Sequence, residues 1–222
     1  MSVKHLDEEA KVLLRRIVES MAARQLASIN ILGHSLKYVT ELDVKVLIAS
    51  ELDLALRLFR QVHALYSELG WTDLESAVRD RVDDVPYPSS RLEFGVFYHV
   101  CGLAEGVAME SYVESVAQEF AAIACSHVEA AARRPEPTRF VEFAAEATNR
   151  PQAQRFLNHW VAIARASFGQ AGTTADARAV ELGLRSQSAA QMDEEFARRL
   201  EPFVRRCGLE LPRFEAQDGA AS

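Results

Sequence analysis

Three ionisable side chains fall on helix faces that should otherwise be apolar. Glu51, Glu105 and His127 each lie within the apolar stripe of a different predicted helix. A carboxylate that is buried without a partner carries a large desolvation cost, so such a group is normally paired or bound to a metal. We therefore expect the three side chains to meet in the core of the protein.

Two glutamates and a histidine form a ligand set that suits iron, with an open position for oxygen. Helix bundles hold two metals with a glutamate from each of two helices and a Glu-x-x-His pair from each of the other two. Leu54 stands where the histidine that follows Glu51 would be. Ala124 replaces the glutamate that would precede His127. The sequence thus predicts an altered metal site, in which Glu51, Glu105 and His127 hold a single iron or a poor pair.

The same residues also allow an interpretation without a metal. A carboxylate in an apolar stripe often pairs with an arginine of a neighbouring helix, and a histidine there is often a hydrogen-bonded core residue. The first predicted helix adds no carboxylate, because its central stripe carries Gln25 and Ser28. Both interpretations stay open on the sequence alone.

Long helices must position these side chains. Apolar residues recur at helical spacing along most of the chain, and no segment alternates apolar and polar residues over the length of a strand. The predicted fold class is therefore all-α, and the first two long helices should pack antiparallel because a short turn joins them. The predicted helices span about 6–37, 43–69, 74–81, 91–110, 113–132, a segment ending near 149, 151–169 and 188–207, with a surface loop at 170–179.

The composition argues against several classes of protein. The 222 residues carry a formal charge of −7 and no basic block, so nucleic acid is not an expected partner. The three cysteines form no Cys-x-x-Cys pair, which argues against a disulfide framework or a structural zinc site. No signal-peptide core or run of membrane-spanning length is present, so we expect a cytoplasmic protein without a membrane partner. We expect one domain over residues 1–215 and a disordered tail at 216–222.

Four stretches, taken in their order along the chain, carry a family resemblance. The stretches "RQLASINILGHSL" and "TELDVKVLIASELDLALRLF" come first, and "AQRFLNHWVAIARASFG" and "SQSAAQMDEEFARRLEPFVRRCGLELPRF" come later in the chain. Together they resemble the phenylacetyl-CoA epoxygenase subunits, which are ferritin-like proteins of the phenylacetate catabolic type. The first pair looks like the first two helices of the structural subunit, and the second pair is similar to the catalytic subunit. The resemblance covers residues 22–214.

This resemblance implies a ferritin-like four-helix bundle with additional C-terminal helices. The catalytic subunit of that family is a di-iron oxygenase that epoxidises the ring of a CoA thioester, and a partner subunit of the same fold serves as a scaffold. On this resemblance Glu51 and His127 match metal ligands. The first-helix carboxylate falls near residues 33–34, and the third-helix carboxylate falls near residues 97–98.

These observations support one main hypothesis and two alternatives. The main hypothesis is an oxidoreductase of the monooxygenase type that uses mononuclear or dinuclear iron and O2 on a small aromatic or acyl substrate. The first alternative is a non-catalytic scaffold that associates with a same-fold subunit, or with itself, through its helix faces. The second alternative is a helical bundle that binds a small molecule without a metal.

Overall fold

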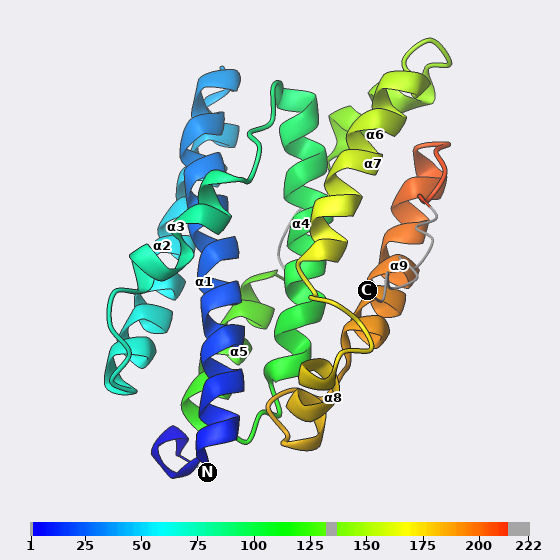
Figure 1. Ribbon diagram of the computed structural model, residues 1–222. Helices are drawn as coiled ribbons and strands as arrows, with labels where there is room; N and C mark the ends of the chain where they lie inside the picture. The colour runs from blue at the N-terminus through cyan, green and yellow to red at the C-terminus, as the bar shows by residue number, and fades with distance from the viewer. Residues whose placement is uncertain (1, 132–136, 213–222) are drawn as a thin grey trace.

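The computed structural model describes residues 2–131 and 137–212 of the chain. Within these residues it contains helices and no strand, so the all-α prediction is confirmed, while a ferritin-like arrangement stays a prediction. Figure 1 shows the long helices running side by side. The helices are α1 (Glu8–Ser35), α2 (Leu42–Glu68), α3 (Leu74–Asp83), α4 (Arg91–Tyr112), α5 (Gln118–Ala131), α6 (Thr138–Ala145), α7 (Arg150–Ala166), α8 (Thr174–Glu181) and α9 (Ala189–Arg206), with short 3-10 turns η1 (Val3–His5) and η2 (Leu36–Tyr38).

The helices α1 and α2 form an antiparallel pair, as their short connection predicts (Figure 1). Asp7 begins α1, because its carboxylate accepts a hydrogen bond from the backbone N–H of Ala10 at 2.7 Å. Buried residues follow along the whole of α1. By contrast, α2 exposes much of its N-terminal half, and Leu47 is exposed although it lies in the apolar stripe.

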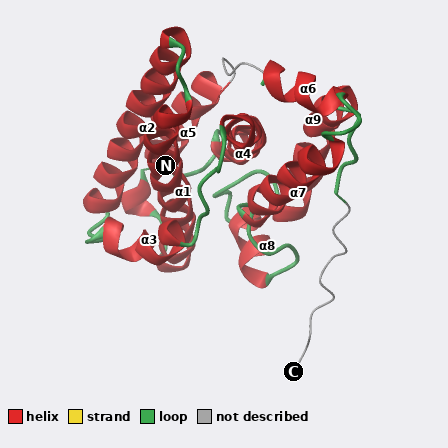
Figure 2. Ribbon diagram, turned by 90° about the horizontal axis from the view of Figure 1, so that it is seen from above, coloured by secondary structure: helices red, strands yellow, loops and turns green. Residues whose placement is uncertain are grey.

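The helix α4 runs through the middle of the molecule (Figure 2). Its neighbours in direct contact are α5, α6, α7 and α9, while α1 contacts α2 and α3, and α2 reaches across to α5. The sequence of α4 is apolar on nearly all sides and buries Gly102 and Gly106, as expected for a central helix. The fold thus places α1 and α2 on one side of the central helix and the C-terminal helices on the other.

The break between the fourth and fifth long helices is longer than predicted. A break near Met109 is present, but α5 begins at Gln118 rather than near Val113. The chain stays in a loop between the two helices because the N–H of Val116 donates a hydrogen bond to the carbonyl of Gly183 at 2.9 Å. The C-terminal region therefore fixes where α5 begins, which a local pattern could not indicate.

Three further boundaries also bear on the predictions. The predicted surface loop at 170–179 is wrong in its second half, because Thr173 caps α8 by accepting a hydrogen bond from the N–H of Asp176 at 3.2 Å. The helix that is predicted to extend to about residue 149 ends at Ala145. The predicted helix end near 132 and the predicted tail at 216–222 lie outside the described residues. None of the helices in the described ranges is long and apolar enough to cross a membrane.

A buried ion pair holds α8 against the start of α9. Asp176 and Arg185 are each 7% exposed, and the Arg185 guanidinium donates to the Asp176 carboxylate. The same carboxylate accepts a hydrogen bond from the N–H of Ala189, the first residue of α9, at 2.9 Å. The Asp176 side chain therefore satisfies two donors that would otherwise be buried without a partner.

Replacing Asp176 with alanine should destabilise the protein by about 3–5 kcal/mol, because the Arg185 charge would stay buried without its partner. Urea denaturation of the variant and the wild type measures this difference. Asp53→Ala is the matched control, since Asp53 pairs with Arg57 on the exposed face of α2 and should change stability by less than about 1 kcal/mol. Equal losses of stability in the two variants would contradict the importance of the buried pair between Asp176 and Arg185.

Candidate ligand cavity

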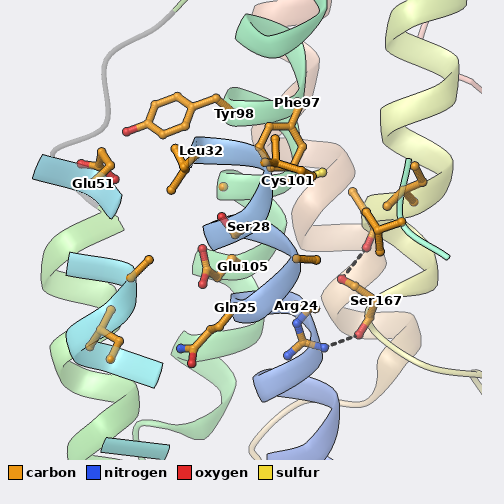
Figure 3. A pocket seen from close by; sticks show the side chains of 18 of the residues that line it. Arg24, Gln25, Ser28, Leu32, Glu51, Phe97, Tyr98, Cys101, Glu105 and Ser167 are labelled. Atoms are coloured by element: carbon orange, nitrogen blue, oxygen red, sulfur yellow. Dashed lines mark hydrogen bonds between the residues drawn. The ribbon is translucent and has the colours of Figure 1, made fainter. Parts of the chain in front are cut away.

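A cavity of about 100 Å³ lies in the core, where α1, α2, α4 and α5 come together and α7 approaches from the far side (Figure 3). Most of its wall is apolar, and a smaller set of polar side chains interrupts the wall. The lining residues with polar groups are Arg24, Gln25, Ser28, Glu51, Tyr98, Cys101, Glu105, His127 and Ser167. An apolar cavity with few convergent polar groups is the usual form of a small-molecule site.

The three residues that the sequence singles out all line this cavity. Glu51 comes from α2, Glu105 from α4 and His127 from α5. In Figure 3, Glu51 lies near one end of the cavity beside Tyr98, and Glu105 lies closer to the middle. Three separate helices therefore bring these groups to one cavity, whereas the expectation that the side chains meet as metal ligands stays a prediction.

The imidazole of His127 is held from both sides and is only 3% exposed. Its Nδ1 lies 3.0 Å from the carbonyl oxygen of Ile123, and a carbonyl can only accept, so Nδ1 carries the proton. In the neutral ring Nε2 is then an acceptor, and the side-chain amide of Gln25 donates to it. This assignment turns the Gln25 oxygen Oε1 away from the ring. That oxygen is buried and has no hydrogen-bond partner.

The described residues do not fit the metal centre that the resemblance implies. Among residues 2–131 and 137–212, no three His, Cys, Asp or Glu side chains come together in a group that could hold a metal ion. The Nε2 atom of His127, the natural ligand atom, already accepts from Gln25. Leu54 lines the cavity where a histidine ligand would be required. The donor set of this cavity is therefore better suited to hydrogen bonding than to coordination of an ion.

The first-helix ligand position that the resemblance implies, near residues 33–34, lies outside the cavity. Gly33 is exposed, and His34 contacts Tyr38, so neither residue lines the cavity. Gln25, about two turns earlier on α1, lines the cavity instead. At the third-helix ligand position, residues 97–98 both line the cavity, but neither side chain is acidic.

Arg24 is the cation of the cavity wall. Its Nη1 donates to the carbonyl oxygen of Ser167 at 2.8 Å and to the hydroxyl of Ser20 at 3.1 Å. Figure 3 shows Arg24 and Ser167 together, at the end of the cavity away from Glu51. The sequence pattern did not single out Arg24. The signal that could have identified it is its position directly before the C-terminal part of α1, which carries almost no charged residue.

A second, more open cavity of about 320 Å³ adjoins the first, and Glu51 and Tyr98 line both. Around its wall Glu41 accepts hydrogen bonds from Arg91 and from Arg139, each at 2.6 Å. The Arg91 guanidinium lowers the pKa of the Glu41 carboxyl to about 2, so this group is ionised at neutral pH. Glu51 and Tyr98 therefore lie where the two cavities meet.

No protein-family model and no curated protein sequence matches the chain. The resemblance to the phenylacetyl-CoA epoxygenase subunits therefore stays a prediction from the sequence.

The protein should contain well below one metal ion per chain when it is produced with added iron and manganese. The physical reason is that His127 already uses both ring nitrogens and that Leu54 offers no ligand atom. Elemental analysis measures this content, with Glu51→Ala as the control. One or two irons per chain that disappear in Glu51→Ala would contradict this expectation and favour the oxygenase hypothesis.

Proposed function

We propose that the protein is a helical bundle that binds a small molecule in the cavity between α1 and α4, without a metal. The observation that carries this proposal is the cavity itself, which is mostly apolar and still contains buried polar atoms without partners. A ligand that fills the cavity would contact its apolar wall and give the buried polar atoms partners.

The size of the cavity limits the ligand to a small molecule. Each water takes about 30 Å³ in the liquid, so the cavity has room for about three waters or for one short-chain organic molecule. A short acyl-sized molecule falls within the substrate class that the sequence suggests. The adjoining open cavity, which Glu51 and Tyr98 separate from the inner one, supplies the entry route.

The oxygenase function remains the family-based hypothesis for a ferritin-like protein of this kind. The donor set favours the metal-free alternative, because Gln25 and Leu54 occupy positions where iron ligands would be needed. The metal content of the purified protein distinguishes the two hypotheses.

Short-chain alcohols such as butan-1-ol should raise the melting temperature of the wild-type protein. Binding to the folded state alone stabilises by about 2.7 kcal/mol when the ligand is at about 100 times its dissociation constant. Ala55→Leu should abolish the shift, because Ala55 lines the cavity and the larger side chain fills it. A thermal denaturation series with increasing alcohol measures the effect.

The matched control for this experiment is Ala49→Leu, which makes the same change on the exposed face of α2. That variant should keep the shift seen in the wild type. If the alcohol shifts Ala55→Leu and the wild type equally, the stabilisation does not come from the cavity and the proposal is wrong.

A same-fold scaffold is a second candidate function, and the outer face of α2 favours it. Leu42 is 75% exposed and Val46, one turn later, is 57% exposed. Exposed apolar side chains at this spacing are typical of a helix face that another protein covers. The occupant we propose is a second copy of the chain, which would pair α2 with α2.

Light scattering during size-exclusion chromatography tests this second candidate. The wild type should elute with about twice the 24.7 kDa mass of one chain, and Val46→Lys should return it to one chain, because a charge cannot be buried there without a partner. Lys45→Ala is the control, since it alters an exposed neighbour without adding a charge to the apolar positions. A wild-type protein that stays at the mass of one chain at high concentration would rule out self-association through α2.

A further inference from the structure

The guanidinium of Arg24 presents one complete edge without a partner. Its Nη1 is anchored by Ser20 and Ser167, while Nε and Nη2 are both buried and make no hydrogen bond in the part of the chain that the structure describes. No carboxylate among those described residues forms an ion pair with Arg24. Arg24 is partly buried, and two of its three guanidinium nitrogens are therefore buried without a hydrogen-bond partner.

The two unpartnered donors have a defined geometry. The guanidinium group is planar, so Nε–H and Nη2–H point in the same direction along one edge. This edge matches the two oxygens of a carboxylate, which it binds through two parallel charge-assisted hydrogen bonds. The anchoring of Nη1 by Ser20 and Ser167 fixes the plane of the group before any ligand arrives.

Gln25 supplies a second and independent sign of a ligand. Its side chain is buried, with only 3% of the residue exposed, and its Oε1 has no hydrogen-bond partner. The bond from the amide nitrogen to His127 determines which way this oxygen points. An amide oxygen only accepts, so the group that satisfies it must be a donor. The same cavity thus offers paired donors on Arg24 and an acceptor on Gln25.

We propose that the cavity binds a short-chain carboxylic acid that also carries a hydrogen-bond donor. The two carboxylate oxygens accept from Nε and Nη2 of Arg24, and the donor, such as a hydroxyl group, reaches Oε1 of Gln25. The short hydrocarbon part lies against the apolar wall. This inference rests on the proposed binding function and names the chemistry of the ligand.

An uncharged ligand would leave more hydrogen-bonding groups of the cavity without partners. An alcohol or a hydrocarbon fills the volume but cannot neutralise Arg24, and it places at most one acceptor against two donors. Buried donors that lack hydrogen-bond partners are costly, and more so on a charged group. The acid should therefore bind more tightly than an alcohol of the same length, by about 10- to 100-fold.

Isothermal titration with butyrate, butan-1-ol and 2-hydroxybutyrate tests the proposal on the full chain. The wild type should prefer butyrate over butan-1-ol by at least about tenfold, and 2-hydroxybutyrate should bind more tightly than butyrate. Arg24→Met should lose the preference for the acid while butan-1-ol binds as before. Arg24→Lys keeps the charge without the paired edge and should retain only part of the preference.

Arg16→Met is the matched control, because Arg16 is an exposed arginine on the same helix, and this variant should leave every affinity unchanged. Circular dichroism and the melting temperature show whether each variant is folded. If Arg24→Met does not fold, Arg24→Lys decides the question together with the three probes in the wild type, because an unchanged preference in Arg24→Lys would contradict binding through the paired edge.

The possible outcomes separate this inference from the proposed function. Butyrate and butan-1-ol binding equally to the wild type, or a preference for butyrate that persists in Arg24→Met, would overturn the role of Arg24. Equal binding of butyrate and 2-hydroxybutyrate would overturn the role of Gln25. If butan-1-ol binds and neither acid does, the cavity still binds small molecules and only this inference fails. If no probe binds, the proposed function fails as well.

Discussion

The hydrogen bond between Gln25 and His127 is the interaction on which the core arrangement depends. It joins α1 to α5 across the bundle, and the carbonyl of Ile123 fixes the proton on the other ring nitrogen. Both ring nitrogens of this buried imidazole therefore have hydrogen-bond partners within the core. The same bond directs the amide oxygen of Gln25 away from the ring. One contact thus joins two helices and orients the buried amide oxygen that lines the cavity.

The polar groups of the cavity are distributed rather than clustered. Arg24 lies at the end nearest Ser167, Glu51 lies at the end nearest Tyr98, and Glu105 lies closer to the middle (Figure 3). A metal centre needs several ligand atoms close to one point, and among residues 2–131 and 137–212 no three His, Cys, Asp or Glu side chains form such a group. A small organic molecule, by contrast, uses polar groups several ångströms apart. The arrangement therefore fits the proposed binding of a small organic molecule.

Helical spacing predicted the long helices, because an apolar stripe repeats locally along one helix. It also indicated Glu51, Glu105 and His127 as interior groups, and all three line one cavity. The same spacing could not predict α8, whose formation depends on a cap at Thr173 and on the distant partner Arg185. It could not predict that α5 begins at Gln118, because a contact with the C-terminal region sets that boundary. Local patterns predict the elements, and long-range hydrogen bonds decide where the elements end.

Arg24 shows why the chemistry of the cavity was harder to predict than its position. A charged residue between apolar neighbours normally extends its side chain to solvent. Here Ser167, from the end of α7, accepts a hydrogen bond from the guanidinium and keeps it inside. That contact joins residues 143 positions apart in the chain, so no spacing on α1 indicates it. The cation of the cavity is thus created by the C-terminal helices packing against α4, and the selectivity of the cavity should depend on that packing as much as on the four helices around it.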